Sequence, residues 1–220
     1  MLHITSFNCQ GLSSSLSDVK TLCDSSDIIA LQETWLFNDD LHVLKNIHEE
    51  FTGAGCSSMD ISKSMLIGRP FGGIAFLWKK SLTGCCELVS FNDNRIIGLK
   101  LTSKNESILL LNVYLPYCCH DNFEQFQMYL GKCGALLQEA DTCKICVIGD
   151  FNADITSVFG KELVNFCKDE QLIIADVELL GHQSDTYTHV SHAYGTTSWL
   201  DHVVCTKQMF DMIWYRSGKI

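Results

Sequence analysis

Amide and carboxylate side chains stand at the ends of several apolar, strand-like runs of this sequence. Asn8 ends the first run, Glu33 follows the second, and Asp150 and Asn152 follow a later one. In α/β proteins, polar side chains at strand ends commonly converge to form the active site. A set of carboxylate and amide oxygens suits Mg²⁺ or Mn²⁺ better than zinc. The spacing therefore predicts an oxygen-lined site for a divalent metal.

Each of these residues also has an ordinary structural explanation. A glutamate that follows a strand is often a solvated turn residue. Asp150 and Asn152, in the order Gly-Asp-x-Asn, could simply form an Asx-turn. The four residues occur together, in order and at spacings that fit one fold, and this joint occurrence favours the functional interpretation.

The elements that would position these residues alternate between strands and helices at the two ends of the chain. Apolar runs predict eight strands, at residues 2–9, 27–32, 73–78, 87–91, 95–101, 108–114, 144–149 and 198–205. Helical spacing of apolar residues predicts helices at 15–23, 122–140 and 159–171, with Asp121 as the N-cap of the second. The pattern favours an α/β sandwich, in which two packed sheets are flanked by helices.

Composition limits the class of protein. The 220 residues fit one domain, and 46% apolar with 19% charged residues is a globular composition. No apolar run approaches the length of a membrane span, and the first residues show no signal peptide, so we expect an intracellular protein, nuclear or cytoplasmic. The net charge of −10 argues against a protein that coats nucleic acid through a broad basic surface.

Cysteines and histidines give a second set of candidate ligands. The twelve cysteines are scattered, so we interpret most as reduced thiols packed as small apolar side chains. Cys143 and Cys146 have the spacing of half a zinc or redox site, although Cys146 opens an apolar strand. A zinc site formed by His182, His189 and His192 is an alternative interpretation of this part of the sequence. His202 follows Asp201 directly, so on a strand it points to the opposite face.

Five motifs together resemble the endonuclease/exonuclease/phosphatase superfamily. They are Asn8-x-x-Gly11, Leu31-Gln32-Glu33-Thr34, Asn112-Val113-Tyr114, Gly149-Asp150-Phe151-Asn152 and Ser198-Trp199-Leu200-Asp201-His202. Two further stretches look most like the endonuclease domain of non-LTR (LINE-type) retrotransposons: Arg69-Pro70-Phe71-Gly72-Gly73-Ile74-Ala75, and Tyr187-Thr188. The resemblance extends from residue 2 to about residue 206.

The resemblance implies a four-layered α/β sandwich and phosphodiester hydrolysis with Mg²⁺, or with Mn²⁺ in its place. Glu33 would hold the metal, with Asn8 beside it. Asp150 would activate the attacking water, Asn152 would hold that water and a phosphate oxygen, and Tyr114 would place its hydroxyl on the phosphate. The remaining two implied positions are Thr188, against the substrate backbone, and Asp201, which would orient a catalytic histidine.

The family pattern continues beyond the Asp201 position to a closing strand that ends in Ser-Asp-His. There the aspartate helps to bind the metal and the histidine contacts the phosphate. This sequence ends at Ile220, its last histidine is His202 and its last acidic residue is Asp211. We therefore expect a single domain over residues 1–220 that is C-terminally incomplete and lacks the final strand, with weak or no activity.

Three functions remain open at this point. The first is a DNA-nicking endonuclease that binds the phosphate backbone, is monomeric, and belongs with a fused or downstream reverse transcriptase. The second is a phosphoesterase of the same fold that acts on RNA, phosphoinositides or sphingomyelin. The third is a catalytically dead domain that only binds a partner. The arginine-to-glycine stretch at residues 69–73 and the Tyr187-Thr188 pair favour the first.

Overall fold

The computed structural model consists of two compact units, residues 1–114 and 115–220. The described residues are 2–59, 69–91, 93–104, 106–182, 184–191 and 194–217. No helix in these ranges is long and apolar enough to cross a membrane.

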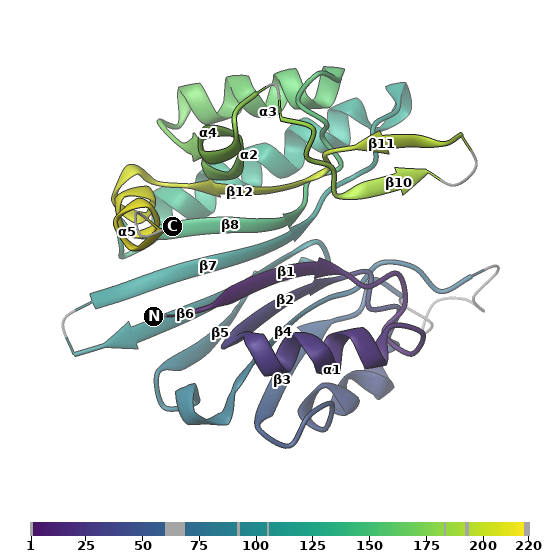
Figure 1. Cartoon of the computed structure of the whole chain (residues 1–220), viewed down its shortest axis with the longest axis vertical. Helices are drawn as coiled ribbons and strands as arrows, with labels where there is room; N and C mark the ends of the chain where they lie inside the picture. Colours follow the sequence, from purple (N-terminus) through teal and green to yellow (C-terminus); the bar gives the residue numbers. More distant parts are fainter. Residues whose placement is uncertain are drawn as a thin grey trace. The chain divides into compact units, whose positions relative to one another are not determined.

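The first unit contains a four-stranded sheet. Its strands are β1 (Ile4–Asn8), β2 (Ile28–Gln32), β4 (Ile74–Lys79) and β3 (Phe51–Cys56), in that spatial order. β1 and β2 are parallel, and the other neighbours are antiparallel. One face packs on helix α1 (Leu16–Ser25) and on the 3₁₀ helix Asn38–Lys45, because Val19, Cys23 and Leu44 bury against alternate residues of the strands (Figure 1).

A second sheet of the first unit packs on the other face. Its strands in this unit are β5 (Cys86–Ser90), β6 (Ile96–Ser103) and β7 (Glu106–Tyr114), all antiparallel, and the 3₁₀ helix Lys80–Leu82 precedes them. Two fully buried amides join the sheets. Gln32 Nε2 donates to Asn112 Oδ1 at 2.7 Å, and Asn112 Nδ2 donates to the carbonyl oxygens of Leu31 and Ala75, both at 2.9 Å. Without these hydrogen bonds, the buried amide groups would destabilise the folded state.

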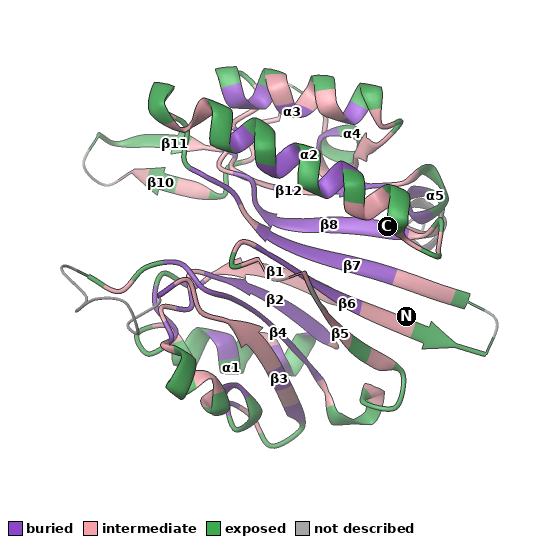
Figure 2. Ribbon diagram, turned by 180° about the vertical axis from the view of Figure 1, so that it is seen from behind, coloured by how far each residue is buried: buried purple, intermediate pink, exposed green. Residues whose placement is uncertain are grey.

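The second unit has strands β8 (Ile145–Asp150), β12 (Asp201–Cys205) and β9 (Ile173–Ile174), with β12 antiparallel to both neighbours. The remaining elements are the 3₁₀ helix His120–Asn122, α2 (Phe123–Glu139), α3 (Val158–Asp169), α4 (Ala175–Leu180), the hairpin β10 (His189–Ser191) with β11 (Thr196–Ser198), and α5 (Lys207–Ser217). Phe126 of α2 packs against Phe159 of α3 in a tilted arrangement, with ring centroids 4.3 Å apart. Every residue of β8 is buried (Figure 2).

Most predicted elements are present, with shifted ends. The strand expected at 198–205 is divided between β11 and β12, and the N-cap of α2 is Asn122, not Asp121, because a 3₁₀ turn precedes the helix. The sequence did not predict β3, α4 or α5. None of the twelve cysteines, all of which lie in the described ranges, forms a disulfide.

Candidate active site

The predicted pair Asn8 and Glu33 is brought together in the first unit. β1 and β2 run parallel with Asn8 opposite Gln32, so the two strands end at the same edge of the sheet. Asn8 Nδ2 donates to Glu33 Oε1 at 2.9 Å, and Asn8 Oδ1 accepts from the backbone N–H of Gln10 at 3.1 Å. The amide therefore orients the carboxylate.

Backbone hydrogen bonds hold the loop that carries Glu33. Glu33 has a left-handed φ of +52°, which is unfavourable for a residue other than glycine. Its carbonyl oxygen accepts from Gly11 N at 2.8 Å, and Trp35 N donates to the carbonyl oxygen of Gly72 at 2.9 Å. Gly72 and Gly73 also have positive φ, of +61° and +84°. The glycines recognised in the sequence thus supply the backbone that fixes Glu33.

Trp35, which the sequence analysis did not assign to the site, belongs to this group. Its Nε1–H donates to Glu33 Oε2 at 3.1 Å, so both oxygens of the carboxylate accept a hydrogen bond from a neighbouring side chain. The Trp35 ring also lies over Gly11, where an added Cβ would come within 2.6 Å of Trp35 Cε3. Position 11 must therefore be glycine for the indole to lie beside Glu33.

Tyr114, the last residue of β7, is paired with Arg95. The guanidinium lies over the tyrosine ring, 5.1 Å from its centroid, and Arg95 Nη1 donates to the Tyr114 carbonyl oxygen at 2.9 Å. Such a cation–π contact fixes the plane of the ring. Arg95 was missed because nothing in its local sequence links it to Tyr114.

The donor set around Glu33 fits a magnesium ion. Mg²⁺ keeps several waters and usually binds through one or two carboxylates. The Glu33 carboxylate satisfies that requirement, while Asn8 turns its amide nitrogen towards Glu33 and its Oδ1 towards the Gln10 N–H. Within the described ranges no group of three or more His, Cys, Asp or Glu side chains is placed to enclose a metal, as a zinc site would need.

Asp150 and Asn152 form the core of the candidate group in the second unit. Asp150 ends β8 and is almost fully buried, and its Oδ1 accepts from the backbone N–H of Asn152 at 2.8 Å. Asn152 has a φ of +52°, and its Nδ2 donates to the Leu115 carbonyl oxygen at 2.9 Å. The Asx-turn is therefore real, and it fixes both side chains at the end of a buried strand.

Asp201 and Thr188 form one cluster. Asp201 lies directly opposite Asp150 in the antiparallel pair β8–β12. Thr188 Oγ1 accepts from the backbone N–H groups of Leu200 and Asp201, both at 3.0 Å, and its hydroxyl donates to the Asp201 carboxylate. Burial raises the pKa of Asp201, while the Thr188 hydrogen bond opposes that rise.

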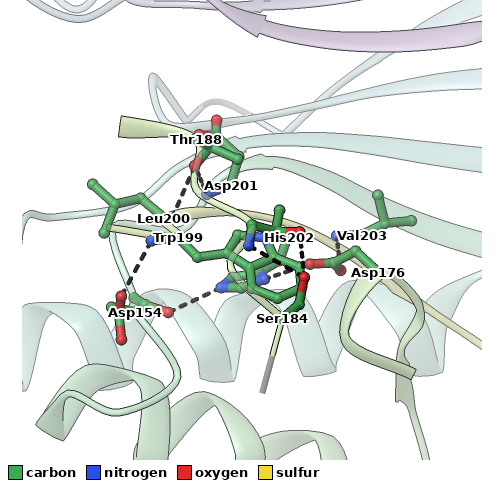
Figure 3. A network of polar contacts seen from close by, with 11 residues as sticks. Asp154, Asp176, Ser184, Thr188, Trp199, Leu200, Asp201, His202 and Val203 are labelled. Atoms are coloured by element: carbon green, nitrogen blue, oxygen red, sulfur yellow. Dashed lines mark hydrogen bonds and ion pairs between the residues drawn. The ribbon is translucent and has the colours of Figure 1, made fainter. Parts of the chain in front are cut away.

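His202 points away from Asp201, as predicted, and is buried. Its Nδ1 lies 2.8 Å from Asp176 Oδ2, and its Nε2 lies 3.0 Å from the Ala153 carbonyl oxygen (Figure 3). Asp176, at the start of α4, was missed because a short polar–apolar segment gives no signal of a buried carboxylate.

The remaining candidate ligands do not form a described site. His182 is exposed, His189 lies in β10, and His192 lies outside the described residues, so the zinc site suggested for this group is not seen in the described part of the chain. Cys143 is exposed, while Cys146 is buried in β8, where burial raises its thiol pKa strongly.

Solved nuclease and phosphatase structures share the fold. A 3′ phosphatase from Neisseria, NExo, solved with a product DNA hairpin, has a TM-score of 0.72 and 14% identity over 96% of this chain and 89% of that one. The endonuclease domain of TRAS1, a telomere-specific non-LTR retrotransposon, gives 0.67 and 15% over 96% and 87%. An AP endonuclease from Leishmania major gives 0.72 and 12% over 96% and 80%. The predicted α/β fold class is thereby confirmed.

No curated protein sequence matches the chain significantly. A family model, however, matches residues 5–211, which is nearly the whole chain and includes all seven predicted site residues. The chain belongs to the Endonuclease/Exonuclease/phosphatase family.

Proposed function

We propose that the chain hydrolyses phosphodiester bonds of DNA with Mg²⁺, as a nicking endonuclease of the retrotransposon type. Membership of a family of hydrolases supports the reaction class. The observation that carries the proposal is the pair of strained loops. Glu33 and Asn152 both adopt a φ of +52°, and both lie at positions where the sequence predicts chemistry. Left-handed non-glycine residues cluster at active sites, where the surrounding structure holds them in place.

Glu33 and Asn8 hold the metal in this proposal. The hydrogen bonds from Asn8 and Trp35 fix the rotation of the Glu33 carboxylate before any ion arrives. When bound, Mg²⁺ supplies the positive charge that stabilises the phosphate oxygens as negative charge develops. The net charge of −10 is compatible with this, because the ion rather than a basic surface offsets the repulsion.

Asp150 orients and deprotonates the attacking water. Its contact with the Asn152 N–H fixes the carboxylate, so the water meets a general base in one orientation. The Asn152 amide nitrogen carries two hydrogens, and one bond to Leu115 leaves a second donor for a phosphate oxygen. Tyr114, with its ring fixed by Arg95, donates its hydroxyl to the phosphate.

Asp201 and Thr188 support the strand opposite Asp150. The Thr188 hydroxyl already binds two backbone N–H groups and the Asp201 carboxylate. We propose a supporting role for this cluster, and the contact of Thr188 with the substrate backbone stays a prediction.

A plasmid-nicking assay tests the proposal. Purified protein is incubated with supercoiled DNA and Mg²⁺, with and without EDTA, and compared with Asp150→Asn. Loss of a general base should lower the nicking rate about 10²–10⁴-fold. The fold should be unaffected, because the asparagine Oδ1 still accepts from the Asn152 N–H. Asp18→Asn, an exposed position on α1, makes the same charge change and should nick as the wild type does.

Two results would contradict the proposal. Nicking that persists in EDTA would show that the reaction needs no metal ion. Equal nicking rates for Asp150→Asn and the wild type would show that Asp150 is not the general base. A folded wild type that nicks no plasmid is then assayed on RNA, on 3′-phosphorylated and abasic DNA, and on phosphoinositides and sphingomyelin. Turnover there would identify another phosphoesterase of the same fold, and none would favour a binding domain.

A further inference from the structure

The loop after β8 holds Asn152 in a left-handed conformation, which asparagine adopts more readily than most residues but which still needs support from its surroundings. Asn152 has a left-handed φ of +52°, and the Asp150 Oδ1 contact with its N–H restrains only the start of the turn. A backbone in this region persists only where surrounding contacts determine it. The Asn152 side chain is bonded to the Leu115 carbonyl oxygen, and the contacts of the residues on either side of Asn152 hold the backbone of the turn.

β12 and the two residues before it, Trp199 and Leu200, supply those contacts. Phe151 N donates to the Leu200 carbonyl oxygen at 3.1 Å, and Trp199 N donates to Asp154 Oδ2 at 3.1 Å. Between these two bonds, His202 Nε2 lies 3.0 Å from the Ala153 carbonyl oxygen. A carbonyl oxygen can only accept, so Nε2 carries the hydrogen and donates it. The residue directly after Asn152 is thus held by a histidine side chain.

Asp176 fixes the histidine from its other side. Its Oδ2 lies 2.8 Å from His202 Nδ1, and its Oδ1 accepts from the backbone N–H of Val203 at 2.8 Å. The His202 side chain is fully buried, and the rings of Phe151 and Trp199 lie about it with centroids 6.0 and 5.8 Å away. The ring has no room to rotate, so its Nε2–H has one direction.

We propose that His202 is a positioning residue for the reaction, which acts by fixing Ala153 and through it the left-handed Asn152. This inference rests on the proposed function, since it assigns His202 a part in that reaction. The positioning role of His202 and an ordinary packing role require different properties of the side chain. Packing needs a flat, buried side chain of the right size, whereas positioning needs a donor at the Nε2 position that reaches the Ala153 carbonyl oxygen.

Two substitutions separate these requirements. In His202→Gln the side-chain amide nitrogen replaces Nε2 and keeps a donor for Ala153. In His202→Asn the shorter amide replaces Nδ1 and keeps only the contact with Asp176. We expect kcat of His202→Asn to fall about 10–100-fold with KM within about threefold, because a small displacement of a catalytic group has effects of that size. We expect kcat of His202→Gln to stay within about threefold of the wild type. His42→Asn, at an exposed position, is the matched control and should leave kcat unchanged.

Equal kcat values for the folded Gln and Asn variants would overturn the proposal, as would a loss confined to KM. A readout without turnover is the backbone amide spectrum. The Asn152 and Asp154 signals should shift and exchange faster in His202→Asn, and should stay near their wild-type values in His202→Gln. If the wild type hydrolyses no phosphodiester, the proposed function fails, while these amide signals still decide whether His202 fixes the loop.

The wild-type protein offers a test that needs no variant to fold. The imidazole ¹⁵N spectrum should show His202 Nε2 protonated, with a slowly exchanging hydrogen, at the pH of the assay. An unprotonated Nε2 would overturn the proposal, because no bond to the Ala153 carbonyl oxygen could then exist.

Discussion

The loops that carry Glu33 and Asn152 share a left-handed backbone angle but have different supports. Both residues have a φ of +52°. Around Glu33 the support comes from the backbone: Gly11 donates to its carbonyl oxygen, and the Gly72–Gly73 turn receives the next two N–H groups. Around Asn152 the support comes from side chains, namely the Asp150 carboxylate and the His202 imidazole. One loop depends on glycines, and the other depends on the chemistry of particular side chains.

This difference predicts which substitutions each loop tolerates. Backbone hydrogen bonds survive most side-chain changes, so the Glu33 loop should fail only where a side chain cannot fit. Side-chain support can be removed one donor at a time without a change in volume. Substitutions that disturb the backbone of the Glu33 loop should therefore act mainly on stability. Substitutions that remove a side-chain donor, at Trp35 or around Asn152, should act mainly on activity.

Gly11→Ala should have the largest effect on stability. The added Cβ would lie 2.6 Å from Trp35 Cε3, at a φ of +102° that alanine disfavours. We expect a loss of about 2–4 kcal/mol in the free energy of unfolding, the range of overpacking and backbone strain combined. Urea denaturation followed by tryptophan fluorescence measures it. Gly84→Ala is the control, since no atom lies within 4 Å of its added Cβ. Equal losses in both variants would contradict the backbone account.

Trp35→Phe should have the second-largest effect, and this effect should be on nicking activity and not on stability. The phenyl ring keeps the apolar contact with Gly11, while the hydrogen bond from Nε1 to Glu33 Oε2 is lost. Removal of such a support for a metal ligand typically costs about 10–100-fold in metal affinity or activity. We expect the Mg²⁺ concentration at half-maximal nicking to rise by about tenfold. An unchanged Mg²⁺ dependence would show that Trp35 only packs, and would sharpen the contrast with His202.

Asp201→Asn should have the smallest effect, and it should depend on pH. Burial raises the pKa of Asp201 above that of the unfolded chain. The folded state therefore binds the proton more tightly, so stability declines as pH rises from the unfolded pKa through the folded one. Asparagine cannot ionise, and its Oδ1 can still accept from Thr188. We expect a higher Tm than wild type at pH 7 and a difference that shrinks towards pH 3, by differential scanning fluorimetry. A lower Tm at pH 7 would mean that the charged carboxylate stabilises the fold.

The strands of the candidate site could be predicted from sequence because their apolar residues are uninterrupted. β2 and β8 are buried along their whole length, and the polar residues that follow them stand out for that reason. β3 was missed because Gly53 and Gly55 dilute its apolar pattern. These glycines are required, since an added Cβ would meet the carbonyl oxygens of Phe76 and Ile74 on β4, at 2.8 and 2.4 Å. The close approach of two strands is a property of the fold and not of the segment.

Of the residues that support the candidate site, some could also be predicted from the sequence and others could not. Gly72 and Gly73 could be singled out because consecutive glycines indicate a turn. Trp35, Arg95 and Asp176 could not be assigned, because each acts through a partner that the chain folding alone brings near it. Asp176 lies in a six-residue helix, too short for a periodic pattern to show which side is buried.

The buried amides between the two sheets of the first unit also limit how those sheets can slide. Asn112 donates to carbonyl oxygens on two different strands, β2 and β4, and accepts from Gln32 on the first of them. A shift of β7 by two residues would keep apolar side chains facing inward, so hydrophobic packing alone would permit it. It would also leave both amides buried without partners, which burial penalises heavily. The hydrogen bonds of Asn112 and Gln32 thus select one alignment of the two sheets among several that would bury similar apolar surface.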